Sequence, residues 1–448
     1  MNNKDKYGEV FTPDFFIEDM IIDASYIMGS NFFSNFKNIF EPGAGKGQFF
    51  NILQNKNNCF KDNFHYTLNE INPDYLLDLS SNTTYFKNNT TIIINDIFNI
   101  SIHNPNQYDL VIGNLPFNYN AKKFVPGLAK NNKDNKLVTN SKSISIWNQI
   151  TQFSFSHLLA NDGFFFCIIP CIWLKPDKAK IFDLFVLQNT IHFIKTFSST
   201  EANKIFNYNC QTPMCYALIQ KKININHVYK QFKLFDKYNN QYKQFKLYND
   251  SCIPTSEVSS IISIQSYLNN FNVHNSFSYL LKVSTLKHDI INSKCFDFYK
   301  GGLENFDHSS FEFKDKIDKD KMYYKIITGS LFDNKHNILT LNGFVSNVQG
   351  LFYGKIKLIL PHKRRAKFFK DIDGSYSLYG RDMYVFLCDN EEQVNQLYDF
   401  FNLPFINNII ENGFKIRMSF IEKYIFQYIP WIFHSNFNMD NFIDWCII

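Results

Sequence analysis

At 448 residues the chain is long enough for two or three domains, each with its own hydrophobic core. Its composition, with 45% hydrophobic and 19% charged residues, excludes a disordered protein, and neither a signal peptide nor an apolar run of the ~18 residues that span a membrane is expected. The net charge of +5 lies in the second half, because residues 1–220 carry 18 basic and 18 acidic side chains whereas residues 221–448 carry 28 and 23.

The first predicted elements lead to a glycine-rich turn. An extended entry ends at Pro13, and apolar residues at helical spacing predict a helix over 14–28. A short strand over 39–41 runs into Pro42-Gly43-Ala44-Gly45-Lys46-Gly47-Gln48, and a helix follows over 48–55. The glycines allow backbone NH groups to approach a ligand closely at the start of that helix.

The spacing of these glycines excludes two common nucleotide-binding motifs. A P-loop needs glycine where this chain has Phe40, and Ser or Thr where it has Gly47. A dinucleotide fingerprint needs its third glycine where the chain has Gln48. What remains is Glu-Pro-Gly-x-Gly-x-Gly, beginning at Glu41.

Three further strands are predicted, and each ends in a polar residue suited to ligand binding. The strand over 64–70 ends in Glu70, which is well placed to accept both hydroxyls of a ribose, and the next strand ends in Asp96. The fourth, over 108–113, is followed by the tetrapeptide Asn114-Leu115-Pro116-Phe117. Its amide can accept hydrogen bonds from an exocyclic amino group, and its ring can stack on a flat heterocycle.

The same tetrapeptide recurs at residues 402–405, after a predicted helix over 391–401. There Asn402 and Pro404 read as a helix stop, so the four letters alone are weak evidence of a site. Only the first copy follows a buried strand and has a glycine-rich turn upstream.

The rest of the first half continues the alternation of helices and strands. After a long polar loop over 118–145, the chain predicts alternating elements: a helix over 145–160, a strand over 164–170, a helix over 178–187, and strands over 191–197 and 214–220. This alternation predicts an α/β domain of three layers, αβα, with a Rossmann-like sheet over residues 1–222.

Residues 223–448 lose this regularity and predict a separate α+β domain with a linker. Helices over 256–270 and 391–401 are expected there, with strands over 325–327, 354–360 and 383–388. All four arginines of the chain lie in this half, and the basic residues that could bind DNA phosphates are Lys363, Arg364, Arg365 and Arg381.

The first half of the chain resembles the gamma class of S-adenosylmethionine-dependent N6-adenine DNA methyltransferases, of which the TaqI enzyme is a member. The resemblance is carried by residues 7–13, the glycine turn, Glu70, Asp96 and the first tetrapeptide. The resemblance covers residues 1–220 and implies a methyltransferase catalytic domain over 1–222. It also implies a DNA target-recognition domain over 223–448.

The resemblance also implies roles for individual residues. S-adenosyl-L-methionine would be the cofactor, and the residues that bind it would be Phe11, Thr12, Pro13, Glu41, Gly43, Ala44, Gly45, Glu70, Asp96 and Asn114. The catalytic residues would be Asn114, Leu115, Pro116 and Phe117. Phe117 would stack on a flipped-out adenine, and Phe206 matches the ring on the far face of that base.

One departure from the family bears on the substrate. The family usually has proline where this chain has Leu115, and the Asn-Leu-Pro-Phe form is seen in rRNA adenine dimethyltransferases. An RNA adenine-N6 methyltransferase is therefore one alternative, and a degenerate methyltransferase that only binds nucleic acid is another.

The resemblance implies the expected partners, and the spacing of the cysteines bears on disulfides and metal binding. A site-specific methyltransferase of a type II restriction-modification system would act on double-stranded DNA, as a monomer, and any cognate restriction endonuclease would be a separate chain. The nine cysteines have neither CxxC pairs nor a zinc-like spacing, so we expect reduced thiols and no metal site. We expect a cytoplasmic protein with access to DNA, from a cell, virus or phage.

Overall fold

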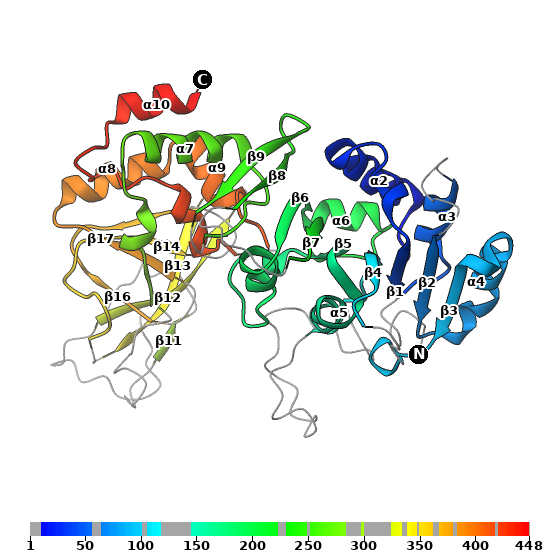
Figure 1. Cartoon of the computed structure of the whole chain (residues 1–448). Helices are drawn as coiled ribbons and strands as arrows, with labels where there is room; N and C mark the ends of the chain where they lie inside the picture. The colour runs from blue at the N-terminus through cyan, green and yellow to red at the C-terminus, as the bar shows by residue number, and fades with distance from the viewer. Residues whose placement is uncertain are drawn as a thin grey trace. The chain divides into compact units, whose positions relative to one another are not determined.

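The computed structural model describes residues 10–55, 64–100, 105–117, 145–222, 230–248, 251–283, 297–299, 324–333, 338–346, 349–361, 367–379, 383–416 and 420–447. The chain forms two compact units, Met1–Thr255 with Ile416–Met418, and Ser256–Lys415 with Ser419–Ile448 (Figure 1). In the described ranges, no helix is both long and apolar enough to cross a membrane.

The first unit is built on a nine-stranded sheet with the order β3-β2-β1-β4-β5-β7-β6-β8-β9. Neighbouring strands are parallel from β3 to β5, and β7 and β9 run antiparallel to their neighbours. The strands are β1 (Asn38–Pro42), β2 (His65–Glu70), β3 (Thr90–Ile94), β4 (Tyr108–Asn114), β5 (Leu159–Pro170), β6 (Thr190–Phe197), β7 (Met214–Gln220), β8 (Lys230–Asp236) and β9 (Gln241–Leu247). Because β1 lies between β2 and β4, the strand order reverses there, which is where doubly wound sheets bind ligands.

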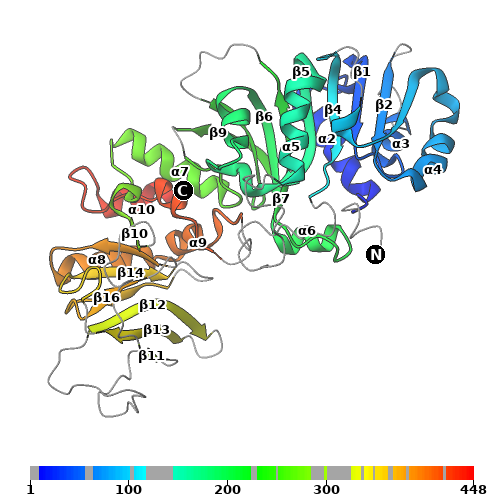
Figure 2. The same cartoon turned by 90° about the horizontal axis from the view of Figure 1, so that it is seen from below.

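Helices cover both faces of this sheet. Its helices are α2 (Asp14–Met28), α3 (Gln48–Asn55), α4 (Leu76–Asn82), α5 (Ile146–Phe153) and α6 (Ser199–Ile205). Short helical turns join them: η1 (Phe33–Asn35), η2 (Pro73–Tyr75), η3 (Thr84–Asn89), η4 (Ile97–Asn99), η5 (Ser154–Leu158), η6 (Cys171–Leu174) and η7 (Asp183–Leu187). Helices α2 and α6 lie on one face and α5 on the other (Figures 1 and 2).

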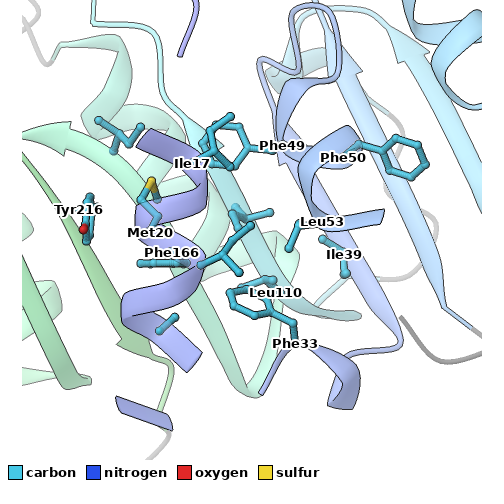
Figure 3. Close-up of a cluster of buried hydrophobic side chains, with 14 of the residues drawn as sticks. Ile17, Met20, Phe33, Ile39, Phe49, Phe50, Leu53, Leu110, Phe166 and Tyr216 are labelled. Atoms are coloured by element: carbon cyan, nitrogen blue, oxygen red, sulfur yellow. The ribbon is translucent and has the colours of Figure 1, made fainter. Parts of the chain in front are cut away.

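The core on the α2 face forms because apolar residues recur at helical spacing. Helix α2 follows Pro13, ends at Gly29 with φ 105°, and buries Phe16, Ile17, Met20, Ile21 and Ala24. Ile17 and Met20 lie over the sheet beside the α3 side chains Phe49 and Leu53 (Figure 3). On the opposite face, Phe165 of β5 packs against Phe155 and Phe185. The prediction of a three-layer, Rossmann-like α/β fold is therefore confirmed.

Two elements of the first unit differ from the sequence prediction. Strand β5 begins at Leu159 rather than 164, because Asp162 adopts φ 62° and the intervening residues form an irregularity in the pairing with β4. Strands β8 and β9 were not predicted at all. They extend the same sheet, and the first compact unit runs to Thr255.

The second unit contains two four-stranded sheets, with the orders β10-β17-β14-β15 and β11-β13-β12-β16. Its strands are β10 (Leu281–Lys282), β11 (Asp297–Tyr299), β12 (Tyr324–Asp333), β13 (Ile338–Ser346), β14 (Lys357–Pro361), β15 (Phe369–Asp371), β16 (Tyr376–Leu378) and β17 (Met383–Leu387). Its helices are α7 (Val258–Asn270), α8 (Glu391–Phe401), α9 (Pro404–Asn412) and α10 (Met439–Ile447), with turns η8 (Ser276–Tyr279) and η13 (Lys423–Tyr428).

The second tetrapeptide copy is a helix stop, as predicted. Asn402 caps the end of α8 and donates its side-chain amide to the carbonyl of Tyr398 across 2.7 Å. Pro404 then starts α9, where its missing NH costs nothing. The assignment of this unit to target recognition stays a prediction.

Candidate active site

The carboxyl ends of β1 and β4 bring the glycine turn and the first tetrapeptide together. These two strands pair in parallel, Ile39 with Leu110 and Phe40 with Val111. A β-carbon added at Gly43 would lie 3.6 Å from Cδ of Pro116 and 3.9 Å from the carbonyl oxygen of Asn114. The glycine turn and the first tetrapeptide therefore lie at one edge of the sheet.

Asn114 is oriented by the segment that precedes α2. Its Nδ2 donates to the carbonyl oxygen of Val10 across 3.2 Å and to Oγ1 of Thr12 across 3.1 Å. Thr12 is buried and Asn114 is half-buried. Within the described part of the chain, Oδ1 of Asn114 accepts no hydrogen bond, so this oxygen is the amide atom that can accept one from a ligand.

The glycine turn has a left-handed backbone that requires glycine. Gly43, Gly45 and Gly47 have φ values of 68°, 55° and 79°, which cost any other residue roughly 1–2 kcal/mol each. The NH of Ala44 donates to the carbonyl of Asn69 across 2.9 Å, which fastens the turn to the end of β2. The glycines therefore let the backbone of the turn pass close to the tetrapeptide.

Glu70 holds the glycine turn from the end of β2. Its Oε2 accepts from the NH of Gly45 across 2.7 Å, and its Oε1 accepts from Ile71 and Asn72, each across 2.8 Å. Glu70 is 5% exposed. Its carboxylate thus accepts three backbone NH groups, and its first role is to order the turn.

Glu41 lies beneath the turn rather than on its outer surface. It is 1% exposed, and its Oε2 accepts a hydrogen bond from the Tyr66 hydroxyl across 2.7 Å. Burial raises the pKa of Glu41 to about 8, although hydrogen bonds from Tyr66 and from the backbone of Phe50 oppose the shift. Glu41 is therefore protonated at neutral pH and supports the turn from inside the protein.

Phe11 borders the turn on its exposed side. A β-carbon at Gly45 would lie 3.5 Å from the Phe11 ring, which is 43% exposed and meets Tyr75 edge to face at 5.8 Å between centroids. The ammonium group of Lys46 lies 6.0 Å from the centre of the Phe11 ring and 3.4 Å from the carboxylate of Asp78. An aromatic ring and a cation thus flank the glycines, and Pro13 follows as the residue before α2.

Asp96 follows β3 at the same edge of the sheet. Its Oδ1 accepts from the NH of Phe98 across 3.1 Å and so begins the helical turn η4. Asp96 is half-buried. Glu70, Asp96 and Asn114 thus lie at or just beyond the carboxyl ends of β2, β3 and β4.

The remaining predicted residues differ in exposure. Leu115 is 1% exposed and its NH donates to the carbonyl of Ile168, whereas Phe117 is half-buried at the border of the core. Phe206 is 3% exposed and packs edge to face on Phe16 of α2. A ring buried in the core cannot stack on a ligand, so the structure does not support the stacking role expected for Phe206.

Two features of the site were not found by reading the sequence. The first is the contact of Thr12 with Asn114, because Thr12 was expected to face the cofactor and not the amide. The second is a carboxylate in the middle of α2: Oδ2 of Asp23 accepts from Lys195 across 3.0 Å, Tyr216 across 2.5 Å and Tyr242 across 2.7 Å. A single acid in an amphipathic helix gives no signal of partners so distant in the chain.

The basic residues expected to bind DNA, Lys363, Arg364, Arg365 and Arg381, lie outside the described residues, as does most of the polar loop over 118–145. The cysteines that the structure describes are free thiols. Cys171 is fully buried, and burial raises the pKa of its thiol well above its usual value.

No protein-family model matches this sequence, and no curated protein is significantly similar to it. Solved structures give distant matches. A Listeria monocytogenes protein assigned to the class I S-adenosylmethionine-dependent methyltransferases matches with 17% identity and a TM-score of 0.34, over 48% of this chain and 62% of that one. The methyltransferase subunit of a type I restriction-modification system from Streptococcus thermophilus matches with 17% identity and a TM-score of 0.37, over 52% and 49%.

A dimethyladenosine transferase from Plasmodium falciparum matches with 12% identity and a TM-score of 0.30, over 48% of this chain and 63% of that one. The matched regions span less than two thirds of each of these three proteins. With TM-scores below 0.5, these likenesses carry no argument about activity, which rests on the residues of this chain.

Proposed function

We propose that this chain is an S-adenosylmethionine-dependent methyltransferase that methylates N6 of a flipped-out adenine in double-stranded DNA. The observation that carries the proposal is the orientation of Asn114. Its Nδ2 is engaged by Val10 and Thr12, so its Oδ1 is left as an acceptor at the carboxyl end of β4, next to the glycine turn.

The residues around the turn fit an adenosyl cofactor. Three glycines in the left-handed conformation allow close approach of the backbone, and the carboxylates of Glu70 and Asp96 follow the next two strands of the sheet. Phe11 would flank the methionine portion of the cofactor. When bound, S-adenosylmethionine would supply an electrophilic methyl group on its sulfonium.

The role expected for Glu70 in binding the ribose is limited by the hydrogen bonds that it already accepts. Its carboxylate accepts from Gly45, Ile71 and Asn72, so a ribose diol would have to share these acceptor sites.

Methyl transfer to adenine N6 requires activation of the amino group and alignment of the two substrates. Adenine N6 is a poor nucleophile because its lone pair is delocalised into the ring. Acceptance of its two hydrogens by Oδ1 of Asn114 and the carbonyl of Leu115 would turn the nitrogen towards tetrahedral geometry and stabilise the charge that develops on it. Because methyl transfer is direct, alignment of the two substrates supplies much of the acceleration.

Base flipping costs a few kcal/mol, and stacking of the base on Phe117 returns about 1–3 kcal/mol. Phe117 is half-buried at the same edge of the sheet, which suits this role. Since Phe206 packs in the core, the proposal assigns stacking to Phe117 alone.

Within this proposal the second unit reads the DNA sequence, and the chain is the methylating component of a type II restriction-modification system. An RNA adenine-N6 methyltransferase is the second candidate, because Leu115 replaces the proline usual in the DNA enzymes.

The test is expression in a bacterial host that lacks DNA methylation, followed by mapping of modified bases in its genomic DNA. The proposal predicts N6-methyladenine at every occurrence of one short sequence. Unmodified genomic DNA together with N6-methyladenine in the host's RNA would favour the second candidate. A calorimetric titration that showed no binding of S-adenosylmethionine would exclude both.

A further inference from the structure

The positive charge of this chain is concentrated in one hairpin of the first unit. Residues 230–248, which contain β8 and β9, carry five lysines and only one acid, Asp236, and so have a net charge of +4. The whole chain has a net charge of +5. Lys243 lies 3.9 Å from the carboxylate of Asp236, which is 1% exposed, and Lys237 pairs with Glu201. Lys233 is a half-buried lysine of the hairpin for which the structure shows no ion pair within its described residues.

The turn of this hairpin lies at the same edge of the sheet as Asn114. Strand β5 is parallel to β4, β7 is antiparallel to both β5 and β6, and β8 is parallel to β6. Strand β8 therefore runs in the direction of β4, and its last residue, Asp236, is at the edge where β4 ends. The order β4-β5-β7-β6-β8 puts four inter-strand steps between them, which is roughly 19 Å at about 4.8 Å a step.

The turn is held rigidly and presents an aromatic ring. Asp236 accepts from the NH of Tyr238 across 3.1 Å and from Nδ2 of Asn239 across 2.8 Å. Lys237 binds the carboxylate of Glu201, which also caps helix α6. Tyr238 itself is 93% exposed.

We propose that the β8–β9 hairpin is a DNA-binding arm of the catalytic unit, which contacts the backbone of the duplex beside the methylated adenine. This inference rests on the proposed function, because it takes the occupant of the Asn114 site to be part of a duplex. A separation of roughly 19 Å corresponds to about five or six base pairs of B-DNA, so the arm meets the flanking duplex and not the target base.

Two roles could explain the lysines of the hairpin: contact with a phosphate backbone, or protection of the edge of the sheet from pairing with other chains. Their arrangement favours the first. Charged side chains on an edge strand prevent pairing with other chains, and this accounts for the lysines of β9, the last strand of the sheet. It does not account for Lys233, which is on β8, inside the sheet. Lys233 pairs with Gln244 and Gln231 with Lys246, so Lys233 and Lys246 share one face of the hairpin.

The test is the salt dependence of binding to a duplex that contains the mapped methylation site. Fluorescence anisotropy gives Kd at several salt concentrations, with S-adenosylhomocysteine present. Each phosphate contact adds about 0.9 to the slope of log Kd against log salt, so the variant Lys233→Gln should lower that slope by about 0.9. Tyr238→Ala should raise the KM for DNA several-fold while kcat stays within two-fold.

Matched control variants come from the opposite edge of the sheet. Tyr85 is 94% exposed and Lys87 is exposed, and both lie in η3, which precedes the amino end of β3. Tyr85→Ala and Lys87→Gln should change neither the slope nor KM. Circular dichroism of each variant checks that the fold is kept.

A hairpin variant whose slope equals that of the wild type, or a Lys87→Gln control that lowers the slope by as much, overturns the DNA-binding arm. A wild-type protein that binds no duplex overturns it as well. These results are separable from failure of the proposed function, which is read from methyl transfer by the unaltered protein and not from binding slopes.

Discussion

The side-chain amide of Asn114 donates to the hydroxyl oxygen of Thr12 across 3.1 Å, although 102 positions separate the two residues. This bond joins the end of β4 to the segment before α2. It fixes which way the amide is turned and directs its oxygen, rather than its nitrogen, to a ligand. The catalytic geometry that we propose therefore depends on a residue outside the tetrapeptide.

Replacement of Thr12 by valine keeps the shape of the side chain and removes the acceptor. Loss of one hydrogen bond of about 1 kcal/mol leaves the Asn114 amide less well oriented, and we expect kcat to fall about five- to ten-fold. Affinity for S-adenosylhomocysteine, measured by calorimetry, should stay within two-fold. Thr12→Ser keeps the hydroxyl and should restore kcat, whereas equal rates for the valine and serine variants would show that the bond has no role.

Replacement of Glu70 by glutamine should damage the site almost as much as replacement by alanine. Both carboxylate oxygens accept backbone NH groups, and the amide nitrogen of glutamine would place a donor against donors. We expect a loss of at least ten-fold in affinity for S-adenosylhomocysteine in a calorimetric titration. If the Glu70→Gln variant bound S-adenosylhomocysteine with the same affinity as the wild type, Glu70 would not order the turn.

Glu41 makes stability depend on pH in an unusual direction. Its pKa rises from 4.5 to about 8 on folding, mainly because burial disfavours the charged carboxylate. The folded state thus favours the protonated form, so its contribution is complete below pH 4.5 and is lost as pH rises towards 8. Integrated over that range, the loss is about 5 kcal/mol at most.

Urea unfolding of the wild type and of Glu41→Gln at several pH values measures this contribution. The wild type should lose stability relative to the glutamine variant between pH 4.5 and pH 8, because only the wild type has a buried carboxyl to ionise. Tyr66→Phe removes a hydrogen bond that lowers the pKa of Glu41, so it should extend the loss to higher pH. A difference between the two proteins that does not change with pH would contradict the raised pKa.

Asp23 pins helix α2 to the sheet through three donors on one oxygen, Lys195, Tyr216 and Tyr242. Burial raises the pKa of Tyr216, so its phenol stays protonated and able to donate. Asp23→Ala should destabilise the first unit by about 3 kcal/mol and lower its Tm by roughly 10 °C. Glu18→Ala, on an exposed position of the same helix, is the control, and an equal Tm shift for both would refute the network.

Much of the first unit could be predicted because its signals are local. Apolar runs marked the strands that end at Glu70, Asp96 and Asn114, and a parallel sheet necessarily gathers their carboxyl ends at one edge. The glycine spacing identified a turn whose backbone is left-handed in the structure. The second tetrapeptide copy was separated from the first by its helical context alone.

What the sequence could not reveal depends on contacts between distant residues. The hairpin β8–β9 was missed because the aromatic residues Phe235 and Tyr242 occupy the mainly polar face of the strands, and the acid Asp236 occupies the buried face, so the alternation that marks a sheet is broken near the turn. Phe206 was assigned to the ligand because its neighbours match a motif, yet it packs on Phe16, more than a hundred residues away. The partners of Thr12 and Asp23 are equally remote.

The central claim is that the first Asn-Leu-Pro-Phe copy, and not the second, is catalytic. The most direct measurement is transfer of labelled methyl groups from S-adenosylmethionine to duplex DNA carrying the mapped site, for Asn114→Ala and Asn402→Ala in parallel. Asn114→Ala should lose at least a thousand-fold in kcat and still bind cofactor, whereas Asn402→Ala, which changes only a helix cap, should transfer methyl groups at the wild-type rate. Undiminished transfer by Asn114→Ala would contradict the account.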